Sequence, residues 1–223
     1  MKKRNELSLL LAIVLTFAVN VSNAQILGWN FSNPDTKGNE ESVSAKIKDP
    51  NLKNAELIRG EALINPNSFT RSFVSKLSLV GTSDNTKEKA FSKGAYYQFT
   101  IQPNKGYAVS LSALNAKLRP GAGGPYYYRW AYSLDGKKFR ELGDKDMSIS
   151  YDYGKPNGLL QPTLALSDVP DLQKVGDKKG VVFRLYIWGG TNPNTATFSI
   201  GRSEAGDSKD YVLSLDGEVK SVK

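Results

Sequence analysis

Aromatic rings beside arginine and glutamine are the side chains of this sequence best suited to binding chemistry. Successive residues of a β-strand point to opposite faces of the sheet, so a charged residue indicates which face meets solvent. If Arg129 and Arg184 face solvent, three expected strands share an outer face of rings and hydrogen-bonding groups. A ring can stack on the C–H face of a sugar, while a guanidinium or amide group binds hydroxyls or carboxylates. We therefore expect a ligand-binding face made of Tyr96, Gln98, Tyr127, Arg129, Arg184, Tyr186 and Trp188.

The opposite face of the same strands is expected to form the core. By the same alternation, most rings of the Tyr-Tyr-Tyr-Arg-Trp-Ala-Tyr run point inward. The expected core rings of this run are Tyr126, Tyr128, Trp130 and Tyr132. A second interpretation of the outer face stays open: a loop or the N-terminal segment covers it and makes it a second small core, with Arg184 as a buried, paired arginine.

Two glycine-containing loops flank the aromatic strands. Arg119 opens the loop that runs to Pro125 and leads into the first of them, so we add Arg119 to the candidate ligand-binding residues. The loop 189–192 follows Trp188 in a similar way. Neither loop has the Lys-Ser/Thr pattern and the following helix of a phosphate-binding loop, which argues against nucleotide binding.

Catalysis is restricted by the absence of histidine from all 223 residues. Without histidine the chain has no Ser-His-Asp or Cys-His nucleophile and no His-bearing zinc site. The acidic residues lie mostly in turn-like contexts such as Asp135-Gly136, whereas a catalytic acid of raised pKa needs a buried site. A tyrosine-based polysaccharide lyase or a carboxylate-pair glycosidase stays open. The residues available to such a lyase are Tyr127, Arg129, Arg184 and Tyr186.

A structural Ca²⁺ is compatible with the sequence, and no other cofactor is expected. Oxygen ligands from loops commonly bind calcium in this way. No EF-hand-like or repeated spacing supports such a site, so its ligands are not assigned. The carboxylates considered for it are Asp35, Asp84 and Asp216.

The first 24 residues have the pattern of a signal peptide. A basic start, Lys2 to Arg4, precedes an apolar run at 7–19, and small residues stand at Ser22 and Ala24. This order predicts cleavage after Ala24. The apolar run is too short to span a membrane. We expect residues 25–223 to form one exported domain with no transmembrane anchor.

The net charge and the cysteine content limit which cellular compartments and which binding partners are compatible with this sequence. The chain has no cysteine, hence no disulfide and no acylated cysteine of a bacterial lipoprotein. We expect it to be secreted or to lie in the periplasm or cell envelope. Its net charge of +8 falls to +6 when three basic residues and one acidic residue leave with the signal peptide. Such a basic protein favours acidic polysaccharides or anionic surfaces, whereas residues 25–223 hold no Lys/Arg block long enough to indicate nucleic acid.

Short β-branched and aromatic runs separated by Gly, Pro, Asn and Asp predict an all-β, antiparallel β-sandwich. No helical pattern of convincing length is present, although 159–175 has room for one helical turn. Asp135-Gly136 predicts a tight hairpin turn with positive φ angles. The expected strands are 27–31, 55–64, 72–79, 95–102, 107–117, 126–133, 139–141, 181–188, 195–200 and 211–219.

Six short motifs together carry a family resemblance. They are G-W-N-F at 28–31, R-G at 59–60, A-Y-Y-Q-F-T-I-Q-P at 95–103, Y-S-L-D-G-K-K-F at 132–139, F-R-L-Y-I-W-G at 183–189 and L-D-G-E-V at 215–219. With them the chain resembles the jelly-roll, carbohydrate-binding-module-like domains of exported bacterial proteins. The resemblance spans most of residues 25–223 and implies two packed antiparallel sheets and a glycan ligand.

Three functional hypotheses follow. The leading one is a secreted, non-catalytic carbohydrate-binding protein that recognises a polysaccharide, acidic or neutral, through the aromatic and arginine face. The second is a structural or adhesion protein of the envelope that binds another protein. The third is a histidine-free polysaccharide lyase or glycosidase. The sequence pattern does not define an oligomeric state.

Overall fold

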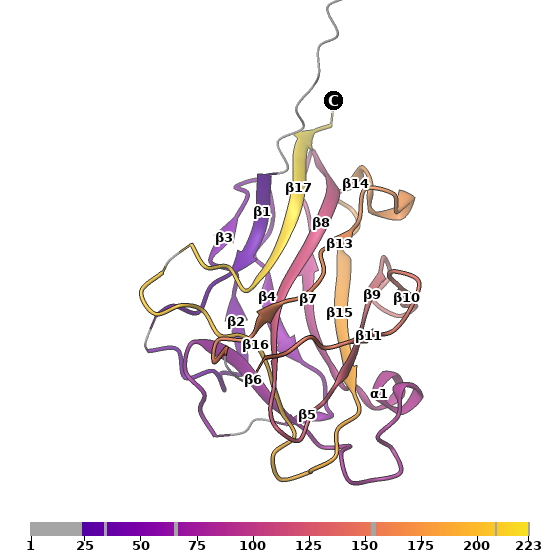
Figure 1. Cartoon of the computed structure of the whole chain (residues 1–223). Coiled ribbons are helices and arrows are strands. Elements are labelled where there is room, and N and C mark those ends of the chain that lie inside the picture. Colours follow the sequence, from indigo (N-terminus) through magenta and orange to yellow (C-terminus); the bar gives the residue numbers. More distant parts are fainter. Residues whose placement is uncertain (1–23, 34, 65–66, 153–154, 208, 223) are drawn as a thin grey trace, which may run out of the picture.

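The chain folds into two antiparallel β-sheets packed face to face (Figure 1). The computed structural model describes residues 24–33, 35–64, 67–152, 155–207 and 209–222. The predicted antiparallel β-sandwich of the jelly-roll type is confirmed. The predicted signal peptide lies almost entirely outside the described residues, which begin at Ala24, the first residue of β1. Among the described residues, no helix is long and apolar enough to cross a membrane.

Ten strands of the described chain form the first sheet, in which β17 and β8 run side by side along the length of the molecule (Figure 1). Its main path is β3 (Ile47–Lys48), β1 (Ala24–Trp29), β17 (Leu213–Ser221), β8 (Tyr107–Pro120), β16 (Thr197–Gly201), β6 (Ser72–Leu77) and β5 (Leu63–Ile64). The short strands β12 (Leu159–Leu160), β13 (Leu164–Ala165) and β14 (Val175–Gly176) pair with β8.

The second sheet has seven strands within the described residues. Its main path is β10 (Arg140–Glu141), β9 (Tyr127–Ser133), β15 (Val181–Trp188), β7 (Tyr96–Ile101), β4 (Glu56–Arg59) and β2 (Ser42–Ser44). The strand β11 (Met147–Ser148) pairs with β9. The expected strand 55–64 is therefore wrong as one element, because β4 and β5 belong to different sheets.

The core lies between the two sheets and is rich in aromatic rings. The Phe99 ring centroid lies 5.0 Å from that of Trp29 and 5.2 Å from that of Phe183. Burying a side chain of this size contributes about 1.5–3 kcal/mol to stability. The inward positions predicted for Tyr128, Trp130 and Tyr132 are confirmed. Tyr126 is only half-buried, because it precedes β9 and donates its hydroxyl to the carbonyl of Ala122.

One helix was not expected from the sequence: α1 (Lys87–Lys93). The Thr86 hydroxyl accepts a hydrogen bond from the Lys89 N–H at its start, which satisfies a free donor of the first turn. Gly94 ends the helix with φ of 78°, a left-handed conformation that favours glycine. In Figure 1, α1 lies beside β15 at the lower right, so it covers part of the outer face of the second sheet.

The Asp135-Gly136 turn joins β9 to β10 as predicted, but only Gly136 has a positive φ, 71°. Asp135 acts through its side chain instead. Its carboxylate accepts hydrogen bonds from the backbone N–H groups of Lys137 and Lys138, both at 2.8 Å. These bonds favour the ionised form and lower the pKa of Asp135 to about 2. In the region 159–175, the predicted helical turn is the 3₁₀ helix η1 (Pro170–Leu172).

Candidate functional site

The sheet register brings seven of the predicted site residues onto one face. Tyr96 and Gln98 of β7 stand opposite Tyr186 and Arg184 of β15, and β9 continues the same face on the other side. Arg119 is separate from them, because β8 belongs to the first sheet. We call this seven-residue surface the aromatic face.

The structure contradicts the expectation that the whole aromatic face meets solvent. Tyr186 is 2% exposed and Trp188 is 8% exposed. Phe91 of α1 stacks on Tyr186 with a centroid distance of 3.8 Å and an angle of 8° between the ring planes. Phe139, which follows the hairpin turn, packs edge-on against Tyr186. The face is thus partly a second small core, as in the alternative that the sequence left open, but the cover is helix α1 with Phe139 and Arg184 is only half-buried.

Arg184 is held in place within this second core. Its guanidinium carbon lies 3.9 Å from the ring centroids of both Tyr96 and Phe139. Its Nε donates to Gln98 Oε1 at 2.7 Å and its NH1 to the Tyr186 hydroxyl at 3.1 Å. Rings and neutral acceptors thus satisfy Arg184, and no carboxylate of the described residues forms an ion pair with it.

Arg129 is also buried, at 5% exposure, where solvent was expected. Its Nε lies 3.0 Å from Glu141 Oε2, although not aligned as a hydrogen bond, and its NH2 donates to the carbonyl of Gly143. Lys87 of α1 binds Glu141 at 2.9 Å and Asp146 at 2.7 Å. Two cations and two anions therefore form a neutral cluster that ties α1 to the β10–β11 region. The prediction that Arg129 faces solvent was wrong because carboxylates of a neighbouring hairpin, rather than water, neutralise its charge.

Tyr127 is the exposed ring of the aromatic face, at 44% exposure. Its ring stacks on Trp188 at a centroid distance of 6.2 Å. One exposed ring is a small contact area for a polysaccharide, and a concave surface elsewhere on the molecule offers a larger one.

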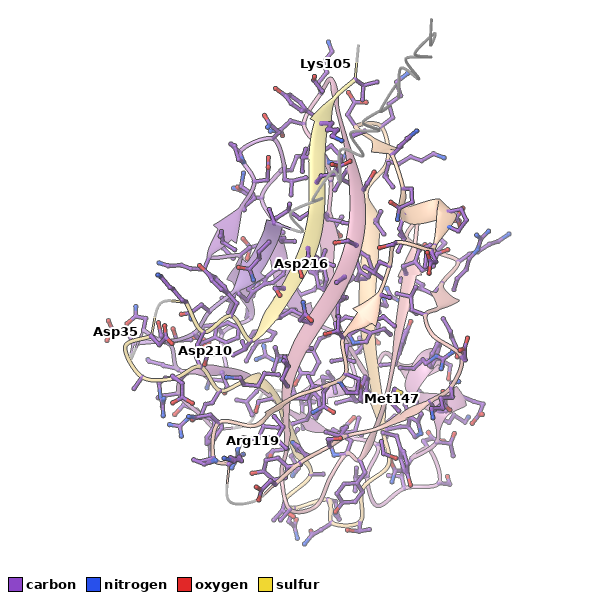
Figure 2. All side chains as sticks on the ribbon, turned by 45° about the horizontal axis from the view of Figure 1, so that its top comes forward. Asp35, Lys105, Arg119, Met147, Asp210 and Asp216 are labelled. Atoms are coloured by element: carbon purple, nitrogen blue, oxygen red, sulfur yellow. The ribbon has the colours of Figure 1, made fainter. Side chains whose placement is uncertain are left out.

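The Arg119 cavity, with a volume of about 640 Å³, lies over the outer surface of the first sheet. Its floor follows the pairing of three strands: Ser199 of β16 stands between Val74 of β6 and Arg119 of β8. Figure 2 shows Arg119 in the lower half of the molecule, far from Lys105 at the upper end. The lining residues are Ile64, Asn67, Ser68, Phe69, Val74, Lys76, Arg119, Asn194, Thr197 and Ser199.

Arginines gather around one ring of this cavity. The guanidinium carbon of Arg119 lies 4.6 Å from the Phe69 ring centroid, and that of Arg202 lies 4.8 Å from it. Each guanidinium is anchored through Nε: that of Arg119 donates to the carbonyl of Pro156, and that of Arg202 to the carbonyl of Thr70. The cavity therefore combines fixed cations with amides and hydroxyls.

Sequence reasoning found Arg119 but not its neighbours. Thr197 and Ser199 lie two residues apart on an expected strand. The alternation of side chains along a strand would therefore have placed both on the outer face of the sheet. Phe69 and Asn67 lie in a loop, and no local pattern connects that loop with Arg119. The loop lies beside Arg119 because β6, which follows the loop, pairs with β16, and β16 pairs with β8.

The carboxylates considered for calcium do not gather. Asp35 lies in an outer loop and Asp216 on β17, well apart (Figure 2). Asp84 instead lies 3.7 Å from Lys89 and 3.9 Å from Lys93 of α1. Within the part of the chain that the structure describes, no group of three or more metal-binding side chains is present.

Comparison with known proteins gives little further guidance. No family model matches the chain, and no curated protein matches it. A solved structure of CpGH89CBM32-5 from Clostridium perfringens, in complex with GalNAc-β-1,3-galactose, matches 74% of this chain and 94% of that chain, with 16% sequence identity and a TM-score of 0.32. A likeness this distant carries no argument about the site.

Proposed function

We propose that this protein is an exported, non-catalytic carbohydrate-binding protein that holds a polysaccharide in the Arg119 cavity. The observation that carries the proposal is the lining of that cavity. It places amide, hydroxyl and cationic side chains from five separate segments around one ring. A sugar presents many hydroxyl groups that both donate and accept hydrogen bonds, and this lining offers partners for both.

The size of the cavity supports a saccharide ligand. A volume of about 640 Å³ falls within the roughly 300–1,000 Å³ that is usual for ligand sites. The floor is also rigid, because Thr197 and Ser199 belong to a strand paired on both sides. Residues fixed in this way lose little conformational entropy when a ligand binds.

The aromatic face, by contrast, supports a structural role. Its rings and Arg184 already bind one another, so a sugar would have to displace α1 and Phe139 to reach them. Tyr127 is the one exposed residue of the predicted set there, whereas Tyr96, Gln98 and Arg184 are half-buried. We therefore place the proposed binding in the cavity that contains Arg119 rather than on the face first expected.

The proposal is tested by titrating residues 25–223 with a panel of neutral and acidic polysaccharides in a calorimeter. We expect saturable binding of at least one polymer, with no change in polymer chain length in the same samples. The double variant Asn194→Ala/Thr197→Ala should weaken this binding while the thermal unfolding curve keeps its shape. Absence of heat with every polymer would reject the proposal, and shortening of the polymer would reject its non-catalytic part.

A further inference from the structure

Two cations line the Arg119 cavity, and two more lie near it. Arg119 and Lys76 line it, and Arg202 shares the Phe69 ring with Arg119. Arg71 lies close enough to Arg202 to repel its charge. We call Arg71, Arg119 and Arg202 the arginine triad.

Among the described residues, no carboxylate lies within ion-pair distance of the triad or Lys76. Arg129 of the second sheet and Lys87 of α1 share two carboxylates instead. Burial, followed by the charges of Arg71 and Arg119, lowers the pKa of Arg202. Cations gathered without anions destabilise the free protein, and an anionic ligand relieves the repulsion.

The triad is held rigid but keeps free donors. NH1 of Arg71 donates to the carbonyl of Ser203, while Arg119 and Arg202 each use Nε for a backbone carbonyl. NH1 and NH2 of Arg119 donate to no other described residue. A guanidinium anchored at one nitrogen can still present its remaining N–H groups to two oxygens of one carboxylate or sulfate.

The Phe69 ring is poorly placed for sugar stacking. Two guanidinium groups already lie within 5 Å of its centroid, so cations cover part of its surface. The ring then serves mainly to fix the two arginines through cation–π contacts. Recognition in this cavity therefore depends more on charge and hydrogen bonds than on ring stacking.

From these observations we infer that the ligand of the Arg119 cavity is an anionic polysaccharide, with Arg119 binding a uronate carboxylate or a sulfate ester. The inference rests on the proposed function, because it names the chemical class of the proposed ligand. Arg202 and Arg71 raise the positive potential at this position, and Lys76 supplies a further cation on the cavity floor.

Two pairs of polymers with matched backbones test the inference. Polygalacturonate is compared with its methyl ester, and dextran sulfate with dextran, each titrated into residues 25–223 at constant ionic strength. We expect the charged member of at least one pair to bind about tenfold more tightly or better, as charge-assisted hydrogen bonds allow. The pair in which the charged polymer binds more tightly shows whether the site recognises a carboxylate or a sulfate group. Equal binding of both members would overturn the inference and leave the proposed function standing, whereas no binding by any polymer would overturn both.

Single-residue variants distinguish binding at a specific site from non-specific electrostatic attraction to a basic protein. Arg119→Ala should weaken binding of the preferred charged polymer about tenfold or more, and Arg119→Lys should weaken it less. Lys105→Ala removes the same charge at the opposite end of the molecule (Figure 2), and it should change the affinity less than about twofold. Thermal unfolding of each variant shows that it is folded. Equal losses in Arg119→Ala and Lys105→Ala would overturn the inference.

A nucleic acid control completes the test. Single-stranded DNA of matched charge should bind at least about tenfold more weakly than the preferred polysaccharide at physiological salt, since phosphate attraction alone is strongly screened. If DNA binds as tightly, and Arg119→Ala weakens both to the same degree, the cavity is a general polyanion site and the saccharide class is wrong.

Discussion

Arg184, Arg129 and Arg119 have three different roles, and the contacts of each decide which. Arg184 lies between two rings, Arg129 belongs to a neutral ion cluster, and Arg119 keeps donors free at a cavity. The first two are structural, because their guanidinium groups already bind groups of the protein itself. Only the third is available to a ligand. The side chain type alone therefore does not predict a binding arginine.

Replacing Arg184 should destabilise the protein. Arg184→Ala removes contacts with two rings and leaves Gln98 without its 2.7 Å hydrogen-bond donor. We expect a loss of about 1–3 kcal/mol in the free energy of unfolding, measured by denaturant titration. Arg140→Ala, which breaks an exposed ion pair with Asp171, is the control and should cost much less, because solvent screens such a pair. Equal losses in the two variants would contradict the structural role of Arg184.

Two buried tyrosines make stability sensitive to alkaline pH. Burial raises the pKa of Tyr128 from 10.0 to about 12, and it also raises the pKa of Tyr97. Above pH 10 the unfolded chain loses these protons before the folded one, so the folded state is progressively disfavoured as pH rises towards 12. Unfolding measured from pH 9 to 12 should show this loss, and Tyr128→Phe should reduce it. Ionisation of all 11 tyrosines near pH 10, without loss of stability, would contradict the assignment.

At the scale of elements, α1 decides what the second sheet can bind. A helix of seven residues is not stable alone in water. It forms here because Phe91 packs on Tyr186 and Lys87 binds two carboxylates of the neighbouring hairpin. In return it covers rings that would otherwise be accessible. The helix and the aromatic face therefore stabilise each other.

Removing the ring of Phe91 should loosen α1 and leave the rest of the sandwich folded. We expect Phe91→Ala to lower stability by about 1–3 kcal/mol, less than a fully buried phenylalanine would, because Phe91 is only partly buried. Hydrogen exchange of residues 86–94 should become faster, and tryptophan fluorescence should shift to longer wavelength as Trp188 gains water. Ser92→Ala, on the exposed side of the helix, is the control. Unchanged exchange in Phe91→Ala would contradict the role of the ring.

The inner faces of the strands were predictable from sequence, and the outer faces were not. Alternation placed Phe99, Trp130 and Phe183 in the core because strand geometry alone fixes which residues share a face. Whether the outer face of a sheet is exposed to water depends on which distant segments of the chain pack on it. For Tyr186 those segments are α1 and the turn near Phe139, and no pattern within β15 reports them.

At the scale of the whole molecule, two groups of cations on different sheets differ in charge balance. The chain carries a net charge of +8. On the second sheet, the cations beside α1 are paired with Glu141 and Asp146. On the first sheet, the arginine triad has no such partners within the described residues. An unbalanced positive surface attracts anionic polymers and directs them to one side of the sandwich.

The most direct test of the account maps the bound polysaccharide by hydrogen–deuterium exchange, with the polymer that binds most tightly in calorimetry. The account predicts slower exchange in the loops 67–70 and 191–196, which border the Arg119 cavity, and no change in residues 86–94 of α1. Slower exchange confined to α1 and the segment 127–146 would place the ligand on the second sheet. That result would contradict the central claim.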